Sequence, residues 1–349
     1  HTGGGQMKIL EDVVKHHSMG SHCTTTILKT LSKHAGYSFS EDMCLGLSSG
    51  LGFTYQKYTG LNYYFFTGRN EQLEENLMNI LGGTIFTGTH DDADDAWETS
   101  KQWIDQGFPV VLEVDMMKLD YIRDKINLDM SFHFGLHTLL LVGYDQDHAY
   151  VLDYLWNQPL KISVDMLKQA RGSKDAPVNP NNRWKVLQFE NNSYFDKRQS
   201  IINALKINHH KYYYPYAFKM GLDGLKVFQK EVKLWFEKKD NTFLRENFYM
   251  MGVLFENVGT GGGNFRRMYA RFLKEAKKNL CDNRIEELQK HYVSLFKLWR
   301  QLATLSLQFA EGAVTDKAAL QTEINDCIHS IFEEEQLSLK MMRMIINDY

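Results

Sequence analysis

Cysteine is scarce in this sequence, with four residues among 349. Cys23, Cys44, Cys281 and Cys327 lie far apart and form no CxxC pair, which excludes a zinc knuckle and a dithiol redox motif. We expect no disulfides in a reducing compartment. For three of the four, the expectation is a small buried hydrophobic side chain. Cys23 differs because of the residues around it.

An excess of either charge is also missing. Forty Lys and Arg stand against 43 Asp and Glu, a formal net charge of −3, so nucleic-acid binding is not expected. No apolar run reaches the roughly 18 residues that a membrane span needs, and no secretion signal is visible. We therefore expect a cytoplasmic protein that does not enter membranes. Residues 1–6 (HTGGGQ) precede the first methionine, and we expect them to be a non-native remnant of expression.

Length and hydrophobic content favour two domains, because 349 residues with 43% hydrophobic side chains can bury two cores. Up to about residue 195, helical patterns alternate with β-rich runs. Helices are expected at 24–35, 71–81, 93–106 and 162–170, strands at 109–114, 137–144, 148–154 and 184–189, and a glycine-rich loop at 46–53. Beyond residue 195 the patterns are helical. The sequence thus predicts an α+β domain at 7–195 and an all-helical domain at 196–349.

Cys23 lies in the first turn of the first of these helices. Ile27, Leu28, Leu31 and Ala35 recur at helical spacing up to Gly36. In the first turn of a helix, unpaired backbone amides and the helix dipole favour a thiolate over a thiol. Cys23 is therefore the candidate nucleophile.

Two apolar runs, 137–144 and 148–154, flank a short polar segment and predict an antiparallel hairpin. With a three-residue loop, Tyr144 pairs with His148 and Leu139 lies opposite Asp153. His137 and Asp153 then project from the same face as diagonal neighbours. A slip of one residue would separate them.

A thiol at a helix start, a histidine that opens a strand and an aspartate on the next strand are the parts of a nucleophile, a base and an orienting group. In this interpretation Cys23 attacks an acyl group, His137 moves the proton and Asp153 holds the imidazole ring. The alternative is a buried thiol, a strand-end histidine and a hairpin carboxylate that never meet. Spacing alone does not decide between the two.

The residues also carry a family resemblance. Residues 21–25 (SHCTT), Ser40-Glu41 and residues 46–55 (GLSSGLGFTY) resemble the N-terminal region of the butirosin biosynthesis protein H family. Residues 137–144 (HTLLLVGY) through Asp153 resemble its histidine and aspartate strands and, more loosely, those of papain-like peptidases. Residues 259–276 (GTGGGNFRRMYARFLKEA) resemble the helical domain of unknown function that usually follows.

This resemblance implies a papain-like fold used for acyl transfer in secondary metabolism, such as antibiotic biosynthesis. An acyl group would leave a carrier-protein thioester for Cys23 and pass to a small-molecule amine. No cofactor would be bound permanently, although phosphopantetheine would arrive on the carrier protein. Six residues before the cysteine, papain-like peptidases often have a glutamine that completes the oxyanion hole, and this chain has His17. The oxyanion candidates are the Cys23 amide and His17.

A second candidate site is the loop at 259–263 (GTGGG), which enters a predicted helix. Amides of Gly261, Gly262 and Gly263, with the guanidinium groups of Arg266 and Arg267, are candidates to hold a phosphate or a carboxylate. A tight turn that needs small residues explains the same pattern.

Other functions remain as alternatives. His133 and His137 form an HxxxH pair, but the β-rich run after His137 argues against a helical metal site, and no metal is expected. The same cysteine, histidine and aspartate would also serve an amidase or peptidase that uses water as acceptor. A non-catalytic binding module is the third hypothesis.

Overall fold

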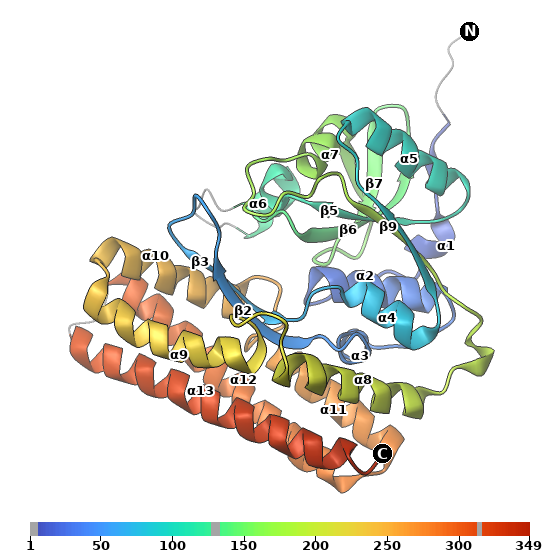
Figure 1. Cartoon of the computed structure of the whole chain (residues 1–349). Helices are drawn as coiled ribbons and strands as arrows, with labels where there is room; N and C mark the ends of the chain where they lie inside the picture. Colours follow the sequence, from blue (N-terminus) through green and yellow to red (C-terminus); the bar gives the residue numbers. More distant parts are fainter. Residues whose placement is uncertain (1–5, 127–132, 313–315) are drawn as a thin grey trace. The chain divides into compact units, whose positions relative to one another are not determined.

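The computed structural model describes residues 6–126, 133–312 and 316–349, so most of the expected expression remnant at 1–6 lies outside the described residues. The chain is of the α+β class, as predicted, and divides into two compact units (Figure 1). The first unit combines residues up to Glu41 with Leu81–Tyr194. The second combines Asp42–Ile80 with Phe195–Tyr349.

The first unit is built on an antiparallel sheet, with strand order β4-β9-β5-β6-β7-β8 and β1 paired to β6. Its described strands are β1 (Lys8–Ile9), β4 (Thr84–Gly88), β5 (Val110–Val114), β6 (His137–Tyr144), β7 (His148–Leu152), β8 (Leu160–Ser163) and β9 (Trp184–Gln188). Strand β6 is buried from its first residue through Gly143. A strand covered on both faces reads as a continuous apolar run, which is the pattern of residues 137–144.

Helices cover this sheet on both faces, with α2 on one side and α5 and α7 on the other (Figure 1). The helices of this unit are α1 (Glu11–Val14), α2 (Cys23–His34), α5 (Ala93–Asp105), α6 (Asp120–Ile126) and α7 (Val164–Arg171), with 3-10 turns η1 (Met116–Lys118) and η2 (Asn192–Tyr194). The Asp92 side chain caps α5 by accepting from the amides of Asp94 and Asp95.

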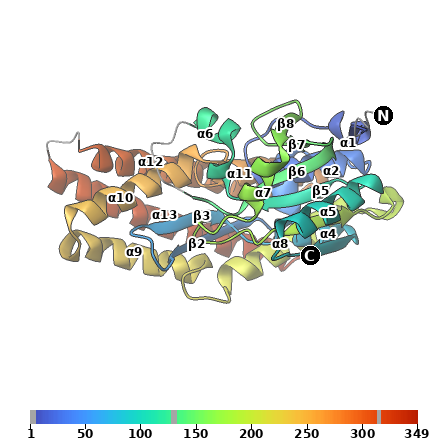
Figure 2. The ribbon, with the colours of Figure 1, turned by 90° about the horizontal axis from the view of Figure 1, so that it is seen from above.

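Long helices dominate the second unit. They are α8 (Lys197–Tyr213), α9 (Gly221–Lys238), α10 (Asn241–Gly252), α11 (Arg266–Leu280), α12 (Asn283–Glu311) and α13 (Lys317–Ile346), with a π turn η3 (Val253–Asn257). Helices α9, α10, α12 and α13 run side by side (Figures 1 and 2). Aspartates cap four of the helices through backbone amides: Asp196, Asp240, Asp282 and Asp316.

The second unit also holds a segment that the sequence assigned to 7–195. This segment contains most of α3 (Glu41–Leu47), the two-stranded sheet of β2 (Leu51–Lys57) and β3 (Tyr64–Arg69), and most of α4 (Leu73–Leu81). The predicted loop at 46–53 is instead the end of α3 and the start of β2. A two-stranded sheet cannot bury its own rings, so Phe53, Tyr55 and Phe66 pack on Phe228 of α9, with ring centroids 5.4 to 5.9 Å away.

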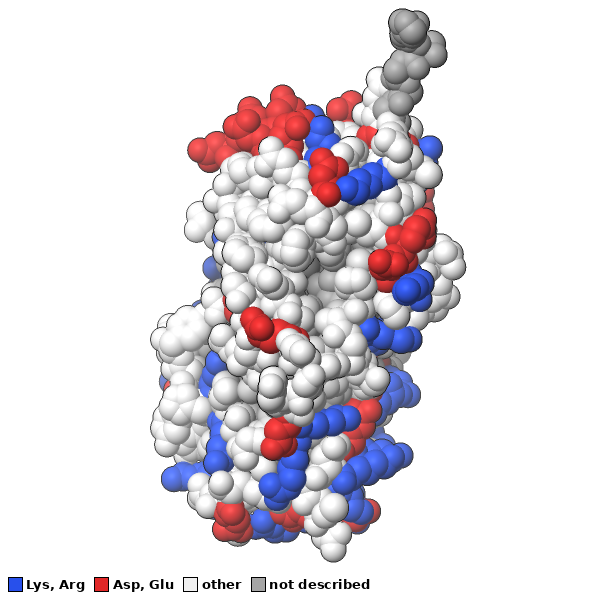
Figure 3. All heavy atoms as spheres, turned by 90° about the vertical axis from the view of Figure 1, so that its right-hand side faces the viewer, with Lys and Arg blue, Asp and Glu red and all other residues white. Residues whose placement is uncertain are grey.

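The surface of the helical unit carries basic side chains. On the face shown in Figure 3, Lys and Arg side chains gather over this unit, with Asp and Glu among them. Helix α8 has four Lys or Arg and no Asp or Glu. Among the described residues, none of the helices has both the length and the apolar character that crossing a bilayer requires.

Candidate active site

Cys23 lies in the first turn of α2, as predicted, where it is the first residue, and it is only 6% exposed. The preceding residue, His22, has extended backbone geometry and provides no side-chain cap. Next to the thiol, the Thr24 hydroxyl lies 3.0 Å from the Thr138 hydroxyl of β6. Because Thr24 follows Cys23 and Thr138 follows His137, this hydrogen bond joins the two segments that carry the candidate nucleophile and base.

Glu41 takes the place of the missing cap. Its carboxylate accepts hydrogen bonds from the Ser21 amide at 2.8 Å, the His22 amide at 3.3 Å, the Thr25 hydroxyl at 3.1 Å and the Thr26 hydroxyl at 2.8 Å. These groups surround the start of α2, so Glu41 fixes the turn that presents Cys23. Sequence reasoning quoted Ser40-Glu41 as a motif but gave the glutamate no role, since a cap from 18 residues downstream has no local pattern.

The β6–β7 hairpin has the predicted register near His137 and Asp153 but a different pairing at its turn. Tyr144 pairs with Ala149 rather than with His148, so the predicted three-residue loop is wrong. A β-bulge between Leu141 and Gly143 shifts the pairing by one residue, and Leu140 then pairs with Leu152. This is the register that places Leu139 opposite Asp153. The bulge thus restores the alignment that the sequence predicted for the site.

The bulge leaves His137 and Asp153 in direct contact. The His137 Nε2 atom lies 3.0 Å from Oδ1 and 2.9 Å from Oδ2 of Asp153. Both side chains are buried, with 3% and 0% of their surface exposed. Since the carboxylate occupies Nε2, Nδ1 is the ring nitrogen left to serve the thiol.

Electrostatics link this pair to Cys23. Burial alone would lower the pKa of His137, but the charge and hydrogen bond of Asp153, followed by those of Cys23, raise it to about 10. The imidazole is therefore protonated near neutral pH. The structure brings together all three residues that the sequence proposed as nucleophile, base and orienting group.

His17 does not fit the role of oxyanion donor. Its Nδ1 atom lies 2.8 Å from the Thr30 hydroxyl, and its Nε2 atom lies 2.8 Å from the Trp156 carbonyl oxygen and 3.2 Å from that of Asp153. Both ring nitrogens are thus occupied by the protein itself. His17 instead fixes the chain that follows β7, a long-range role that sequence spacing does not reveal.

Two further groups donate to the Asp153 carboxylate. The Tyr121 hydroxyl of α6 donates to Oδ2 at 2.7 Å, and the Tyr154 amide donates to Oδ1 at 2.7 Å. Asp153 is fully buried, so these donors and His137 stabilise its charge in place of water. Sequence reasoning missed Tyr121, because its segment carries no recognisable motif.

The second candidate site is occupied by the protein's own groups. Arg266 is fully buried: its Nε donates to Glu335 at 2.6 Å, and its Nη1 donates to the carbonyl oxygens of Gly68 at 2.9 Å and Asn264 at 2.8 Å. The same guanidinium donates from Nη2 to the Tyr212 hydroxyl at 3.1 Å. Arg266 is therefore a structural residue and not an anion ligand.

The glycine loop has the same character. The Gly262 amide donates to the Thr260 hydroxyl at 3.2 Å, and the Gly263 amide donates to Glu256 at 2.7 Å. Gly261, Gly262 and Gly263 all have positive φ, which explains the glycines as a tight turn. Arg267 is exposed and lies over the Phe296 ring at 5.5 Å. These contacts favour a tight turn over the expected anion site at Gly261–Gly263, Arg266 and Arg267, because the amides of Gly262 and Gly263 and the Arg266 guanidinium already bind protein groups.

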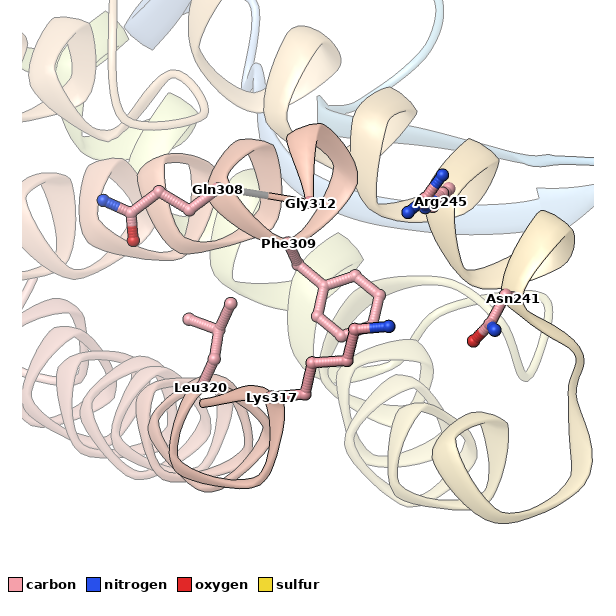
Figure 4. Close-up of a pocket in the computed structure, with 7 residues that line it drawn as sticks. All are labelled: Asn241, Arg245, Gln308, Phe309, Gly312, Lys317 and Leu320. Atoms are coloured by element: carbon pink, nitrogen blue, oxygen red, sulfur yellow. The ribbon is translucent and has the colours of Figure 1, made fainter. Parts of the chain in front are cut away.

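Neither a metal-binding cluster nor a pocket adds a further candidate site in the described residues. In the described ranges, no group of three His, Cys, Asp or Glu side chains is arranged to hold a metal ion. A small pocket in the helical unit lies between the end of α12 and the start of α13, and no catalytic candidate lines it (Figure 4). Its lining residues are Asn241, Arg245, Gln308, Phe309, Gly312, Lys317 and Leu320.

Comparisons with known proteins give two matches in chain order. Residues 22–154 match the family described as butirosin biosynthesis protein H, N-terminal, and residues 165–342 match a domain of unknown function (DUF4872). The first match begins one residue before Cys23 and ends one residue after Asp153. A search of curated proteins finds no match. The family's name points to a biosynthetic enzyme. The chain therefore belongs to the butirosin biosynthesis protein H family, with its N-terminal domain followed by the domain of unknown function.

Proposed function

We propose that this protein is a cysteine-dependent acyltransferase of secondary metabolism, with a papain-like catalytic domain. It would accept an acyl group from a thioester on Cys23 and deliver it to an amine. The observation that carries the proposal is the buried His137–Asp153 pair, which interacts with a thiol at the first position of a helix. Family membership supports a biosynthetic role.

In the first half-reaction, the Cys23 thiolate attacks the thioester carbonyl carbon, and a tetrahedral intermediate forms. When it collapses, the bond to the donor sulfur breaks and the donor leaves as a thiol, which takes its proton from the His137 imidazolium. The high pKa of His137 supports this step, because the residue holds the proton that the leaving group needs. The Cys23 amide remains the oxyanion candidate.

In the second half-reaction, an amine attacks the Cys23 acyl-enzyme. Neutral His137 takes a proton from the amine nitrogen, the new amide bond forms and Cys23 leaves as a thiolate. The thiolate and imidazolium of the resting site are thereby restored. Asp153 stays hydrogen-bonded to Nε2 of the imidazole throughout, so that Nδ1 serves both steps.

The proposed donor is an acyl carrier protein or another thioester. Phosphopantetheine would then belong to the partner and would not be a resident cofactor. The proposed acceptor is a small-molecule amine.

Intact-mass measurement after incubation with a synthetic pantetheine thioester tests the covalent step. We expect one acyl group on the wild-type protein and none on Cys23→Ala. Cys281→Ala is the matched control, because Cys281 is the exposed cysteine, contrary to the sequence expectation. An equal adduct on Cys23→Ala would refute the proposal.

The acceptor, an amine or water, is what separates transfer from hydrolysis. Cys23 and His137 are 6% and 2% exposed, and this burial restricts the access of both acceptors. Partition of the isolated acyl-enzyme between water and added amines measures this choice. Faster loss to water than to any amine would favour the amidase or peptidase alternative, whereas alkylation of Cys23 at the rate of an ordinary thiol would favour the binding module.

A further inference from the structure

Tyr121 contacts the candidate site through Asp153 and not through the thiol. Its hydroxyl donates to Oδ2 of Asp153 at 2.7 Å, and the same oxygen lies 2.9 Å from Nε2 of His137. The phenol and the imidazole therefore share one carboxylate oxygen. Because Asp153 is fully buried, water does not replace the phenol as a donor.

The Tyr121 ring is itself held in place. It packs edge-on against Trp156, with ring centroids 5.0 Å apart, and the Trp156 carbonyl oxygen lies 2.8 Å from Nε2 of His17. Burial, followed by the charge and hydrogen bond of Asp153, raises the pKa of Tyr121 well above its usual value. The phenol thus stays protonated and remains a donor over the whole working range of pH.

We propose that Tyr121 is a positioning residue of the active site, which fixes the Asp153 carboxylate and draws part of its negative charge away from His137. A hydrogen bond to a carboxylate stabilises its charge and weakens its pull on a neighbouring cation. Tyr121 would thereby keep the imidazolium acidic enough to release its proton to the leaving group. The benefit to catalysis rests on the proposed function, whereas the effect of Tyr121 on Asp153 and His137 is independent of it.

The titratable groups that face the pair are Cys23 from α2, His17, Tyr154 and Tyr121 itself. Changing Tyr121 to Phe keeps the ring and its packing on Trp156 and removes only the hydroxyl. The matched control is Tyr150→Phe, since the Tyr150 hydroxyl donates to Asp145 at 2.8 Å in the same sheet, at the turn end of the hairpin.

NMR titration of the His137 ring in the full chain tests the inference without any acyl substrate. In Tyr121→Phe we expect the titration midpoint to move upward by roughly one pH unit, with an unchanged midpoint in Tyr150→Phe. A midpoint that stays in place or moves downward in Tyr121→Phe overturns the inference, as does an equal shift in Tyr150→Phe. An upward shift together with absence of any Cys23 acyl adduct would uphold Tyr121 and reject the acyltransferase proposal.

Discussion

Single residues decide the chemistry of the site, and Asp153 is the one on which the others depend. It accepts from His137, Tyr121 and the Tyr154 amide while excluded from water. The pKa of His137 is raised by this charge despite burial. The ion pair therefore stabilises the folded state below the ordinary histidine pKa near 6.5, and this contribution is lost as the pH rises through about 10.

The pH dependence of the acylation rate should reflect the protonation of His137. We expect the rate of Cys23 acylation to fall as the pH rises through about 10, because the imidazolium that protonates the leaving thiol is lost. In Asp153→Asn this limb should move down toward 6.5, and the rate at neutral pH should drop on the order of 10²–10⁴-fold. Release of thiol from a pantetheine thioester measures both effects. Asp145→Asn, in the turn of the same hairpin, should leave the limb unchanged.

Glu41 is the residue that prepares Cys23. Glu41→Gln removes the negative charge and replaces one of the two carboxylate oxygens, which together accept from two amides and two hydroxyls, with an NH2 donor, so we expect a loss of about 1–3 kcal/mol in the free energy of unfolding. Urea denaturation measures it. Glu98→Gln is the comparison, because Glu98 on α5 is exposed and forms an ion pair with Lys101. Equal losses in the two variants would mean that Glu41 has no special role.

Among the structural elements, α11 shows how neighbouring residues of one type can differ in role. Arg266 is buried and paired with Glu335, whereas Arg267 is exposed. We expect Arg266→Met to cost about 3–5 kcal/mol of unfolding free energy, because Glu335 is left as an unpaired buried charge. Arg267→Met should stay within about 0.5 kcal/mol. Urea denaturation of the two variants, which both remove one charge, separates burial from charge; similar values would contradict the structural role of Arg266.

The β6–β7 hairpin is the element on which the site depends most. Its turn pairs Tyr144 with Ala149, and only the bulge before Gly143 returns His137 and Asp153 to neighbouring positions on one face. Without the bulge, the pairing of Tyr144 with Ala149 would continue along both strands. Asp153 would then be shifted by one residue relative to His137. The two registers differ by one residue, so the bulge is a requirement of the site.

For the whole molecule, the distribution of basic residues bears on the proposed carrier protein. Arg267, Arg271, Lys274 and Lys278 recur along one exposed face of α11, and the last three form no ion pair within the described ranges. Like charges at this spacing repel one another. A partner with an acidic surface would relieve this repulsion and associate faster.

Charge reversal tests this surface. We expect Arg271→Glu, Lys274→Glu and Lys278→Glu together to raise the KM for an acyl carrier protein thioester at least tenfold at low salt, because steering by opposite charge is lost. The KM for a free pantetheine thioester should not change. Parallel kinetics with the two donors decide it, and an equal rise for both donors would count against α11 as the carrier surface.

Much of the candidate site was readable in the sequence. The helix with Cys23 in its first turn follows from local periodicity, and the two apolar runs that contain His137 and Asp153 predict adjacent strands. Both features depend on residues close together in the chain, where patterning and backbone geometry act directly. The α+β class and the helical C-terminal half follow in the same way.

Tertiary structure alone decided which groups meet across long separations. Three such contacts join segments whose local sequence favours no particular partner. They are the hydrogen bonds of Glu41 with the start of α2, of Tyr121 with Asp153 and of His17 with the Trp156 carbonyl oxygen. Burial against Glu335 gives Arg266 its structural role. The local sequence, an arginine next to a glycine turn, does not show whether the side chain faces solvent or the core. The aromatic side chains of β2 and β3 likewise pack on distant helices, for example Phe53 on Phe228 of α9 and on Trp299 of α12. The sequence by itself determined most of the helices, the strands around His137 and Asp153 and the choice of candidate residues, whereas the packing of distant segments determined which of those residues lie together.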